Sequence, residues 1–197
     1  MALTVSKTRD VLVEVARQLF AREGVDNTTM NDIAQASQKG RRTLYTYFRS
    51  KDDVFLAVVE SELDKQCDIL SDIAAQNMPA DEKLAMFIYT RLDAVKNIVF
   101  RNGTLRAQLF RDIWRVEKIR KKFDRHVIGI LKNILTDGIN DGIFVASNIQ
   151  MTANILHHAL KGLEVPYIRG LMVSSETDRI NQKEFVMNMI FNGIKIK

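Results

Sequence analysis

Apolar residues recur along this chain at intervals of three and four, the periodicity of amphipathic α-helices. In residues 6–23, for example, Val11, Val15 and Leu19 share one helical face, and Gly24 supplies a left-handed stop. The sequence contains only two prolines, and no stretch alternates clearly between apolar and polar positions. The pattern therefore predicts an all-α protein.

Cap and stop residues divide this pattern into nine predicted helices. A Ser or Thr followed three residues later by an acid or amide indicates a helix start, as at Thr29 with Asp32 and at Ser147 with Gln150. Asp137-Gly138 and Pro166 indicate stops. The predicted helices cover residues 6–23, 30–37, 41–48, 51–76, 81–101, 104–115, 117–136, 147–164 and 178–194.

The helix lengths predict two domains. Three short elements fall within the first 50 residues, and longer helices follow. We therefore expect a small three-helix head in residues 1–51 and a larger helical body in residues 52–197.

Positive charge is concentrated in the predicted head. The formal net charge is +5. Residues 1–51 carry nine Lys and Arg against five Asp and Glu, whereas the remaining residues carry twenty against nineteen. This asymmetry indicates an anionic partner for the head, with a merely solvated basic face as the alternative.

Residues 28–48 have the organisation of a helix-turn-helix. A capped short helix is followed by a turn with Gly40 and by a second short helix. A recognition helix needs an apolar face that anchors it and a donor-rich face that meets phosphates and base edges. In the second short helix the polar face is Arg42, Thr43, Thr46 and Tyr47, and the inward side is Leu44, Tyr45 and Phe48.

Several motifs follow one another in this N-terminal region. They are Ala16-Arg-Gln-Leu-Phe20, Gly24, Thr28-Thr29-Met30, Ile33-Ala34 and Thr43-Leu-Tyr-Thr-Tyr-Phe-Arg-Ser-Lys51. In order and spacing they resemble the N-terminal signature of the TetR family of transcriptional regulators. Residues 52–197 resemble the family only in the number and lengths of their helices.

The resemblance implies roles for individual residues in binding a double-stranded DNA operator. Thr29, Tyr47 and Lys51 would contact phosphates. Arg41, Arg42 and Thr43 would read base edges at the start of the third helix. Lys39, Arg41 and Arg42 make the turn more basic than is usual in the family, which favours phosphate contact.

The turn between the second and third helices departs from the family. The family pattern is Ala-Gly-Val-Ser-x-Gly-Thr-Leu-Tyr, whereas Ala36 to Tyr45 is one residue longer and lacks the buried Val. The sequence alone therefore leaves the base-reading register open by one residue.

The resemblance also implies a ligand cavity among the fifth to eighth helices of the body. The candidate lining residues are Phe87, Phe110, Trp114 and His126. Helical spacing by itself indicates only core packing for such aromatic residues. The expected effector is a small, largely apolar molecule, with an anionic end as one alternative.

The last two predicted helices are candidates for a homodimer interface. Their apolar rows are Leu156, Ala159, Leu160 and Leu163 in one helix and Phe185, Met189 and Ile190 in the other. The spacing is that of a four-helix seam. Part of these rows must face the protomer's own core.

No motif indicates catalysis, a metal or a cofactor. The sequence has no Gly-rich phosphate loop and no Gly-x-Ser-x-Gly motif, and neighbouring His157 and His158 point about 100° apart on a helix. Cys67 is the only cysteine and the N-terminal segment lacks a secretory signal, so we expect a cytoplasmic protein. No apolar run approaches the ~18 residues of a membrane helix.

Two functions remain after these exclusions. The favoured one is a homodimeric DNA-binding transcriptional regulator, usually a repressor in this family, that a small molecule releases from its near-palindromic operator. The alternative is a helical interaction protein whose basic head binds nucleic acid without sequence specificity or binds an acidic partner.

Overall fold

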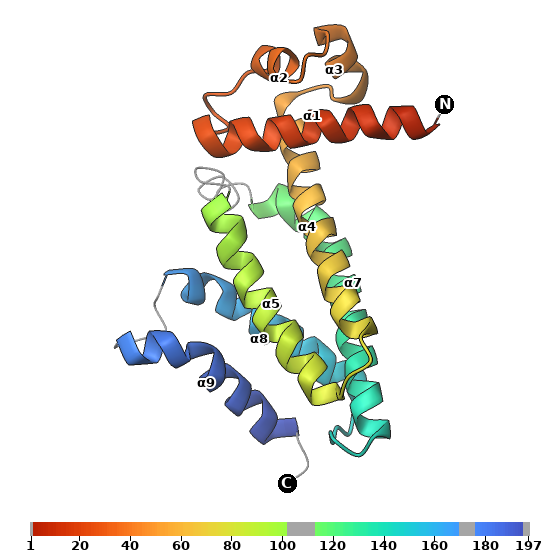
Figure 1. Cartoon of the computed structure of the whole chain (residues 1–197), viewed down its shortest axis with the longest axis vertical. Coiled ribbons are helices and arrows are strands. Elements are labelled where there is room, and N and C mark those ends of the chain that lie inside the picture. Colours follow the sequence, from red (N-terminus) through yellow and green to blue (C-terminus); the bar gives the residue numbers. More distant parts are fainter. Residues whose placement is uncertain (1, 102–112, 170–175, 195–197) are drawn as a thin grey trace. The chain divides into compact units, whose positions relative to one another are not determined.

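The computed structural model describes residues 2–101, 113–169 and 176–194. These residues form α-helices and no β-strand, which confirms the all-α prediction (Figure 1). The helices are α1 (Ala2–Glu23), α2 (Met30–Ala36), α3 (Arg41–Tyr47), α4 (Lys51–Ala75), α5 (Ala80–Arg101), α7 (Ile113–Asn140), α8 (Ile149–Arg169) and α9 (Glu176–Ile194). The helix predicted over 104–115 falls mainly outside the described residues, and 113–115 belong to α7.

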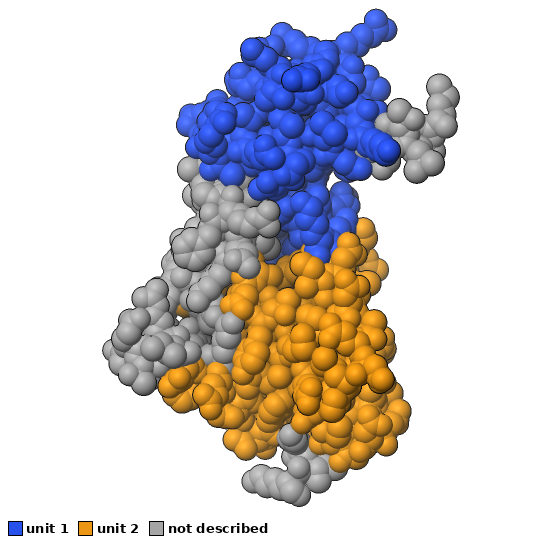
Figure 2. Space-filling view, viewed as in Figure 1, with its two compact units in different colours: residues 1–65, 97–121 blue, residues 66–96, 122–197 orange. Residues whose placement is uncertain are grey.

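The chain divides into two compact units (Figure 2). Unit 1 contains Met1–Lys65 and Asn97–Lys121, and unit 2 contains Gln66–Lys96 and Lys122–Lys197. The helix α4 carries residues of both units, because the division falls after Lys65. The functional boundary after residue 51 stays a prediction.

One apolar core joins α1, α2, α3 and the first turns of α4 within unit 1. Its members include Leu12, Ala16 and Phe20 of α1, Ile33 of α2, Leu44 of α3, and Val54, Phe55 and Val58 of α4, all of them buried. The Phe20 and Phe55 rings meet edge to face with centroids 6.5 Å apart. This core fixes α2 and α3 on the same side of α1 (Figure 1).

The helix α7 continues past the predicted stop at Asp137-Gly138 and ends at Asn140. Gly138 serves close packing, because a Cβ atom there would overlap the ring of Phe144. The chain turns instead at Gly142, whose φ of +68° lies in the left-handed region. The N–H groups of Ile143 and Phe144 then donate to the Gly138 carbonyl at 2.8 and 2.9 Å.

The helix α8 also differs from its prediction at both ends. Its cap is Asn148, whose Oδ1 accepts the Met151 N–H at 2.9 Å, so Ser147 lies outside the helix. Asparagine is as effective an N-cap as serine, which explains the shift by one residue. The helix continues through Pro166 to Arg169, while Glu164 before the proline is anchored by an ion pair with Arg91.

None of the described helices combines the length and the apolar character that crossing a membrane requires.

Candidate nucleic-acid interface

The start of α2 has the predicted capping box. The Asp32 N–H donates to Thr29 Oγ1 at 3.2 Å, and the Thr29 N–H donates to Asp32 Oδ2 at 2.8 Å. The Thr29 hydroxyl also donates to the Asp32 carboxylate, and these bonds from Thr29 lower the pKa of Asp32 below its ordinary value. Thr29 is exposed at this helix start, where backbone N–H groups favour an anion. Its contact with phosphate stays a prediction.

The turn between α2 and α3 is closed by a left-handed residue, Gln38, with φ +54°. The Gln38 N–H donates to the Gln35 carbonyl, and the Lys39 N–H donates to the Ala34 carbonyl, both at 3.0 Å. This pair of bonds defines a Schellman motif, in which the left-handed position is usually glycine. Gln38 therefore occupies the place of the first glycine in the family pattern.

The position of Gln38 suggests a second alignment of the turn with the family pattern. Eight residues run from Gln38 to Tyr45, and eight run from the first glycine to the tyrosine of the family pattern. The extra residue arises when Ala36 is aligned with the alanine of the pattern. When Gln38 is aligned with the first glycine, Ser37 takes the place of that alanine instead. With Gln38 aligned to the first glycine, the residues up to Tyr45 have the spacing of the family pattern, and the base-reading register of α3 stays a prediction.

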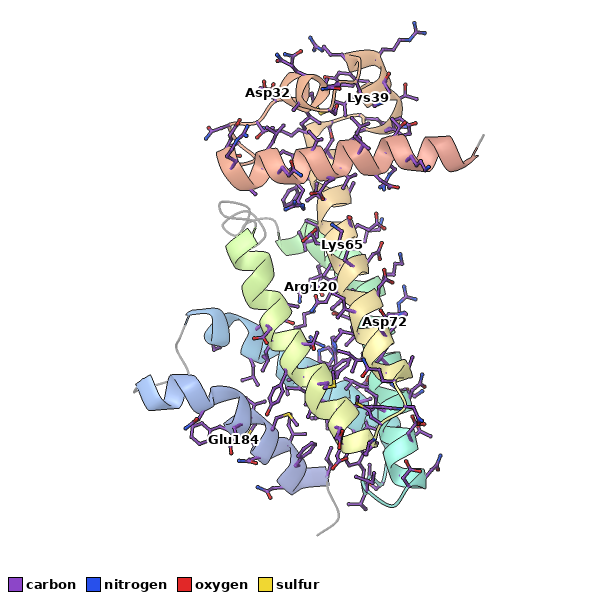
Figure 3. The ribbon with its side chains drawn as sticks, in the orientation of Figure 1. Asp32, Lys39, Lys65, Asp72, Arg120 and Glu184 are labelled. Carbon is purple, nitrogen blue, oxygen red and sulfur yellow. The ribbon has the colours of Figure 1, made fainter. Side chains whose placement is uncertain are left out.

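This alignment indicates where the chain departs from the pattern. Lys39 replaces the buried valine and is exposed at the turn (Figure 3). Gly40 replaces the serine and caps α3 without a side-chain hydrogen bond. Arg42 replaces the second glycine and is exposed, so α3 carries a cationic side chain that the pattern lacks.

Replacing Gln38 with glycine should raise the free energy of unfolding by up to about 1 kcal/mol. A left-handed residue other than glycine costs about 1–2 kcal/mol, and the greater freedom of glycine in the unfolded chain offsets part of this gain. Urea denaturation monitored by circular dichroism measures the change. Gln35→Gly, at an exposed helical position of α2, is the control and should lower stability by about 1 kcal/mol. Destabilisation by both substitutions would contradict the strain at Gln38.

The exposed face of α3 includes one aromatic residue that the sequence analysis placed inward. Tyr45 is 45% exposed, whereas Tyr47 is partly buried against the core of unit 1. Leu44 and Phe48, four residues apart, define the buried face, and Tyr45 is rotated about 100° from Leu44. Helical geometry was the signal that could have identified Tyr45 as a surface residue.

Positive charge dominates this face of the head. Arg41 and Arg42 are exposed on α3, and Thr43 is partly exposed beside them. Residues 30–50 contain four Lys and Arg against a single acid, Asp32. The predicted base-reading and turn residues are therefore brought together on one cationic surface, which suits a polyanion.

Lys51 is the exception among the predicted DNA-contacting residues. It is the first residue of α4, and its ammonium donates to the carbonyls of Val25 at 2.6 Å and Asp26 at 3.2 Å. Its charge is engaged by the connection between α1 and α2.

The four predicted cavity residues are not brought together among the described residues. Phe87 is fully buried in α5. His126 is exposed on α7, with Nε2 3.0 Å from Ser71 Oγ. Phe110 lies outside the described residues, as does the side chain of Trp114, whose backbone belongs to α7. The cavity stays a prediction.

The predicted dimer residues divide between core and surface. Leu156 and Leu160 are buried within the protomer, which assigns them to its own core, and Leu163 and Ile190 are partly buried. Ala159, Phe185 and Met189 are exposed. The surface of α8 also carries Met151 and Ile155, which the sequence analysis missed because the exposed row is shifted by one position from the buried one.

A buried polar network joins α5, α7 and α8 within unit 2. The fully buried Arg91 guanidinium lies 3.0 Å from both His157 Nδ1 and Glu164 Oε1. A guanidinium only donates, so Nδ1 is the acceptor and the ring proton of His157 is on Nε2. That nitrogen lies 3.2 Å from Asp124 Oδ1, and Lys161 donates to Asp124 Oδ2 at 2.9 Å.

Asp124 is the most strongly perturbed acid of this network. Burial alone would raise its pKa, but the contacts with His157 and Lys161 outweigh burial and hold the pKa well below its ordinary value. The network was not anticipated from the sequence, where these residues are scattered over three helices.

The geometry of the head is that of a known class of protein. A capped short helix, a Schellman turn and a second helix with an exposed cationic face form a helix-turn-helix, the module of DNA-binding transcriptional regulators. Residues 12–58 match the family described as "Bacterial regulatory proteins, tetR family". The N-terminal region of the chain is thus a helix-turn-helix of the tetR family, whose members are DNA-binding transcriptional regulators.

Comparisons over the whole chain agree with this assignment. The HTH-type transcriptional regulator QacR of Staphylococcus aureus is 19% identical over 193 residues, covering 94% of this chain and 97% of QacR. A crystal structure of a transcriptional regulator from Cytophaga hutchinsonii superposes with a TM-score of 0.77 at 23% identity, covering 95% of this chain and 98% of that chain. The structure of a SmeT–triclosan complex has a TM-score of 0.64 at 16% identity, covering 97% and 93%. The structural likenesses show a shared fold.

Proposed function

We propose that the chain is a transcriptional repressor that binds a near-palindromic operator as a homodimer and is released by a small-molecule effector. The observation that carries this proposal is the cationic face formed by Lys39, Arg41 and Arg42 on a helix-turn-helix. Arg42 is the principal base reader, because it adds a donor-rich side chain where the family pattern has glycine.

A homodimer follows from the small reach of one head. A single short recognition helix covers a few base pairs, so a specific operator requires two heads related by a two-fold axis. The exposed apolar side chains of α8 and α9 supply the surface for a second copy of the chain: Ile155 is 59% exposed and Met189 is 66% exposed. A surface rich in exposed apolar side chains favours an interface.

Effector release is supported by a relative and by chain connectivity. SmeT, which shares this fold, has been solved with triclosan, a small and largely apolar molecule. The helix α4 begins beside the recognition helix and carries residues of both units, so a ligand in unit 2 has a covalent path to the head. The ligand must bind the DNA-free arrangement more tightly for release to follow.

Substituting Arg42 with alanine should relax the preference at one base pair by about 1–3 kcal/mol. The bidentate contact of an arginine with guanine is lost, while the phosphate contacts remain. Fluorescence anisotropy with the duplex upstream of the chain's own gene, and with its single-base-pair variants, measures the effect. Arg22→Ala, at an exposed end of α1, is the control and should leave the preference unchanged. Equal losses on the upstream duplex and on random DNA would contradict base reading by Arg42.

A mobility shift with excess competitor DNA separates this function from the alternative. A repressor should retain its shift with the upstream duplex when random DNA is in excess. A head that binds any nucleic acid would be competed equally by every duplex and by RNA, and an acidic protein partner would leave no shift at all.

A further inference from the structure

We propose that Lys51 is a positioning residue that holds the connection between α1 and α2, and that it is not a phosphate ligand of the DNA complex. This inference rests on the proposed use of α2 and α3 as the DNA-binding face. It concerns how that face is set in place.

The connection between α1 and α2 is fixed by bonds to successive backbone carbonyls. Asn27 Nδ2 donates to the Glu23 carbonyl at 2.9 Å, and Thr28 Oγ1 donates to the Gly24 carbonyl at 2.7 Å. These bonds are local, since each spans four residues. The next two carbonyls, of Val25 and Asp26, accept the Lys51 ammonium, which comes from 26 and 25 residues further along the chain. Lys51 therefore ties the connection to the start of α4.

The electrostatics favour this placement of the Lys51 charge. A cation in the first turn of a helix opposes the helix dipole, and α4 begins with Lys51 followed by Asp52 and Asp53. The ammonium instead reaches the carbonyls just beyond the end of α1, where the dipole is negative. The Lys51 ammonium lies 2.6 Å from the Val25 carbonyl oxygen, within reach of a hydrogen bond whose donor is charged.

The hydrogen bonds of Lys51 affect the DNA-binding face through Thr29. The connection ends at Thr29, the cap of α2, and α2 leads through the Schellman turn into α3. Lys51 thus fixes where α2 begins. Two of the three N–H donors of the Lys51 ammonium are directed to these carbonyls, whereas Lys39 is exposed at the turn without such a tie to the connection.

Salt titration of DNA binding tests the proposal on the full-length chain. Each phosphate contact contributes about 0.9 to the slope of log affinity against log salt. Lys39→Met should therefore reduce the slope by about one. Lys51→Met should leave the slope unchanged and weaken binding to the upstream duplex several-fold at every salt concentration. All measurements are made at a temperature well below the thermal unfolding midpoint of each variant. Amide hydrogen exchange at residues 24–33 should be faster in Lys51→Met and unchanged in Lys39→Met.

A slope that falls by about one in Lys51→Met would overturn the proposal, because it would identify a phosphate contact. Unchanged affinity in the folded Lys51→Met protein would also overturn it. If Lys39→Met leaves the slope unchanged while Lys51→Met behaves as expected, the positioning role stands and the DNA contact proposed for the turn fails.

A second measurement uses the wild-type protein, so it tests the proposal even if Lys51→Met does not fold. In the wild-type protein, the ammonium nitrogen resonance of Lys51 should keep its chemical shift when the upstream duplex is added, while that of Lys39 should move. A shift of the Lys51 resonance as large as that of Lys39 would contradict the proposal.

Discussion

Replacing Arg91 with methionine should lower the free energy of unfolding by about 3–5 kcal/mol, the cost of breaking a buried ion pair from one side. The Arg91 side chain is fully buried, and its guanidinium contacts both Glu164 and His157. Methionine fills a similar volume but cannot donate, so a buried carboxylate loses its guanidinium partner. Guanidinium chloride denaturation of the purified chain measures the loss.

Two further variants separate the ion pair from general effects of the substitution. Arg22→Met removes a guanidinium whose partner Glu23 is at the surface, and it should change stability by less than about 1 kcal/mol. The double variant Arg91→Met with Glu164→Met should lose about 1–3 kcal/mol less free energy of unfolding than the two single losses added together, because neither partner is left buried alone. Additive losses would mean that the two side chains are not energetically coupled.

The sequence predicted the helix-turn-helix in detail because its signals are local. The capping box of Thr29 with Asp32 needs only residues three apart, and the apolar anchors Leu44 and Phe48 follow from helical periodicity. Both were confirmed. The register of the turn was left open, since it depends on which residue adopts the left-handed conformation, and Gln38 gives no compositional signal for that role.

Helix ends in the body were predicted less well because tertiary packing decides them. Gly138 looked like a stop, yet it is a helical residue that makes room for the ring of Phe144. Pro166 looked like an end, yet α8 continues through it. In α7 the packing of Phe144 against Gly138 outweighs the local preference, and in α8 the helix passes Pro166 just after the buried ion pair of Glu164 with Arg91.

Faces of helices were the hardest feature to assign. In α8 the buried Leu156 and Leu160 and the exposed Ile155 and Ala159 are all apolar or small, so the pattern does not reveal which row faces the core. The polar network supplies the missing information, because His157 and Glu164 must lie on the side that meets Arg91. We infer that these buried polar groups fix the rotation of α8 and thereby leave Ile155 at the surface.

Substituting Asp124 with asparagine should lower the free energy of unfolding by about 2 kcal/mol at pH 7, the range for a hydrogen bond to a charged group. Asparagine keeps the shape of the side chain but loses the charge that faces Lys161 at 2.9 Å. Denaturation with urea at pH 7 measures this loss. Asp137→Asn is the control, since Asp137 is exposed and lies 3.4 Å from Lys83, and it should change stability by less than about 1 kcal/mol.

The same substitution should change how stability depends on pH. The pKa of Asp124 in the folded chain is lowered from its ordinary value of 3.8, so the unfolded chain binds this proton first as the pH falls. The stabilisation is therefore complete above about pH 5 and is lost progressively as the pH falls below about 4. The wild-type protein and Asp124→Asn should differ most in stability near neutral pH and converge in acid. A difference that stays constant from pH 7 to pH 3 would show that the charge of Asp124 does not contribute to stability and that the loss comes from packing alone.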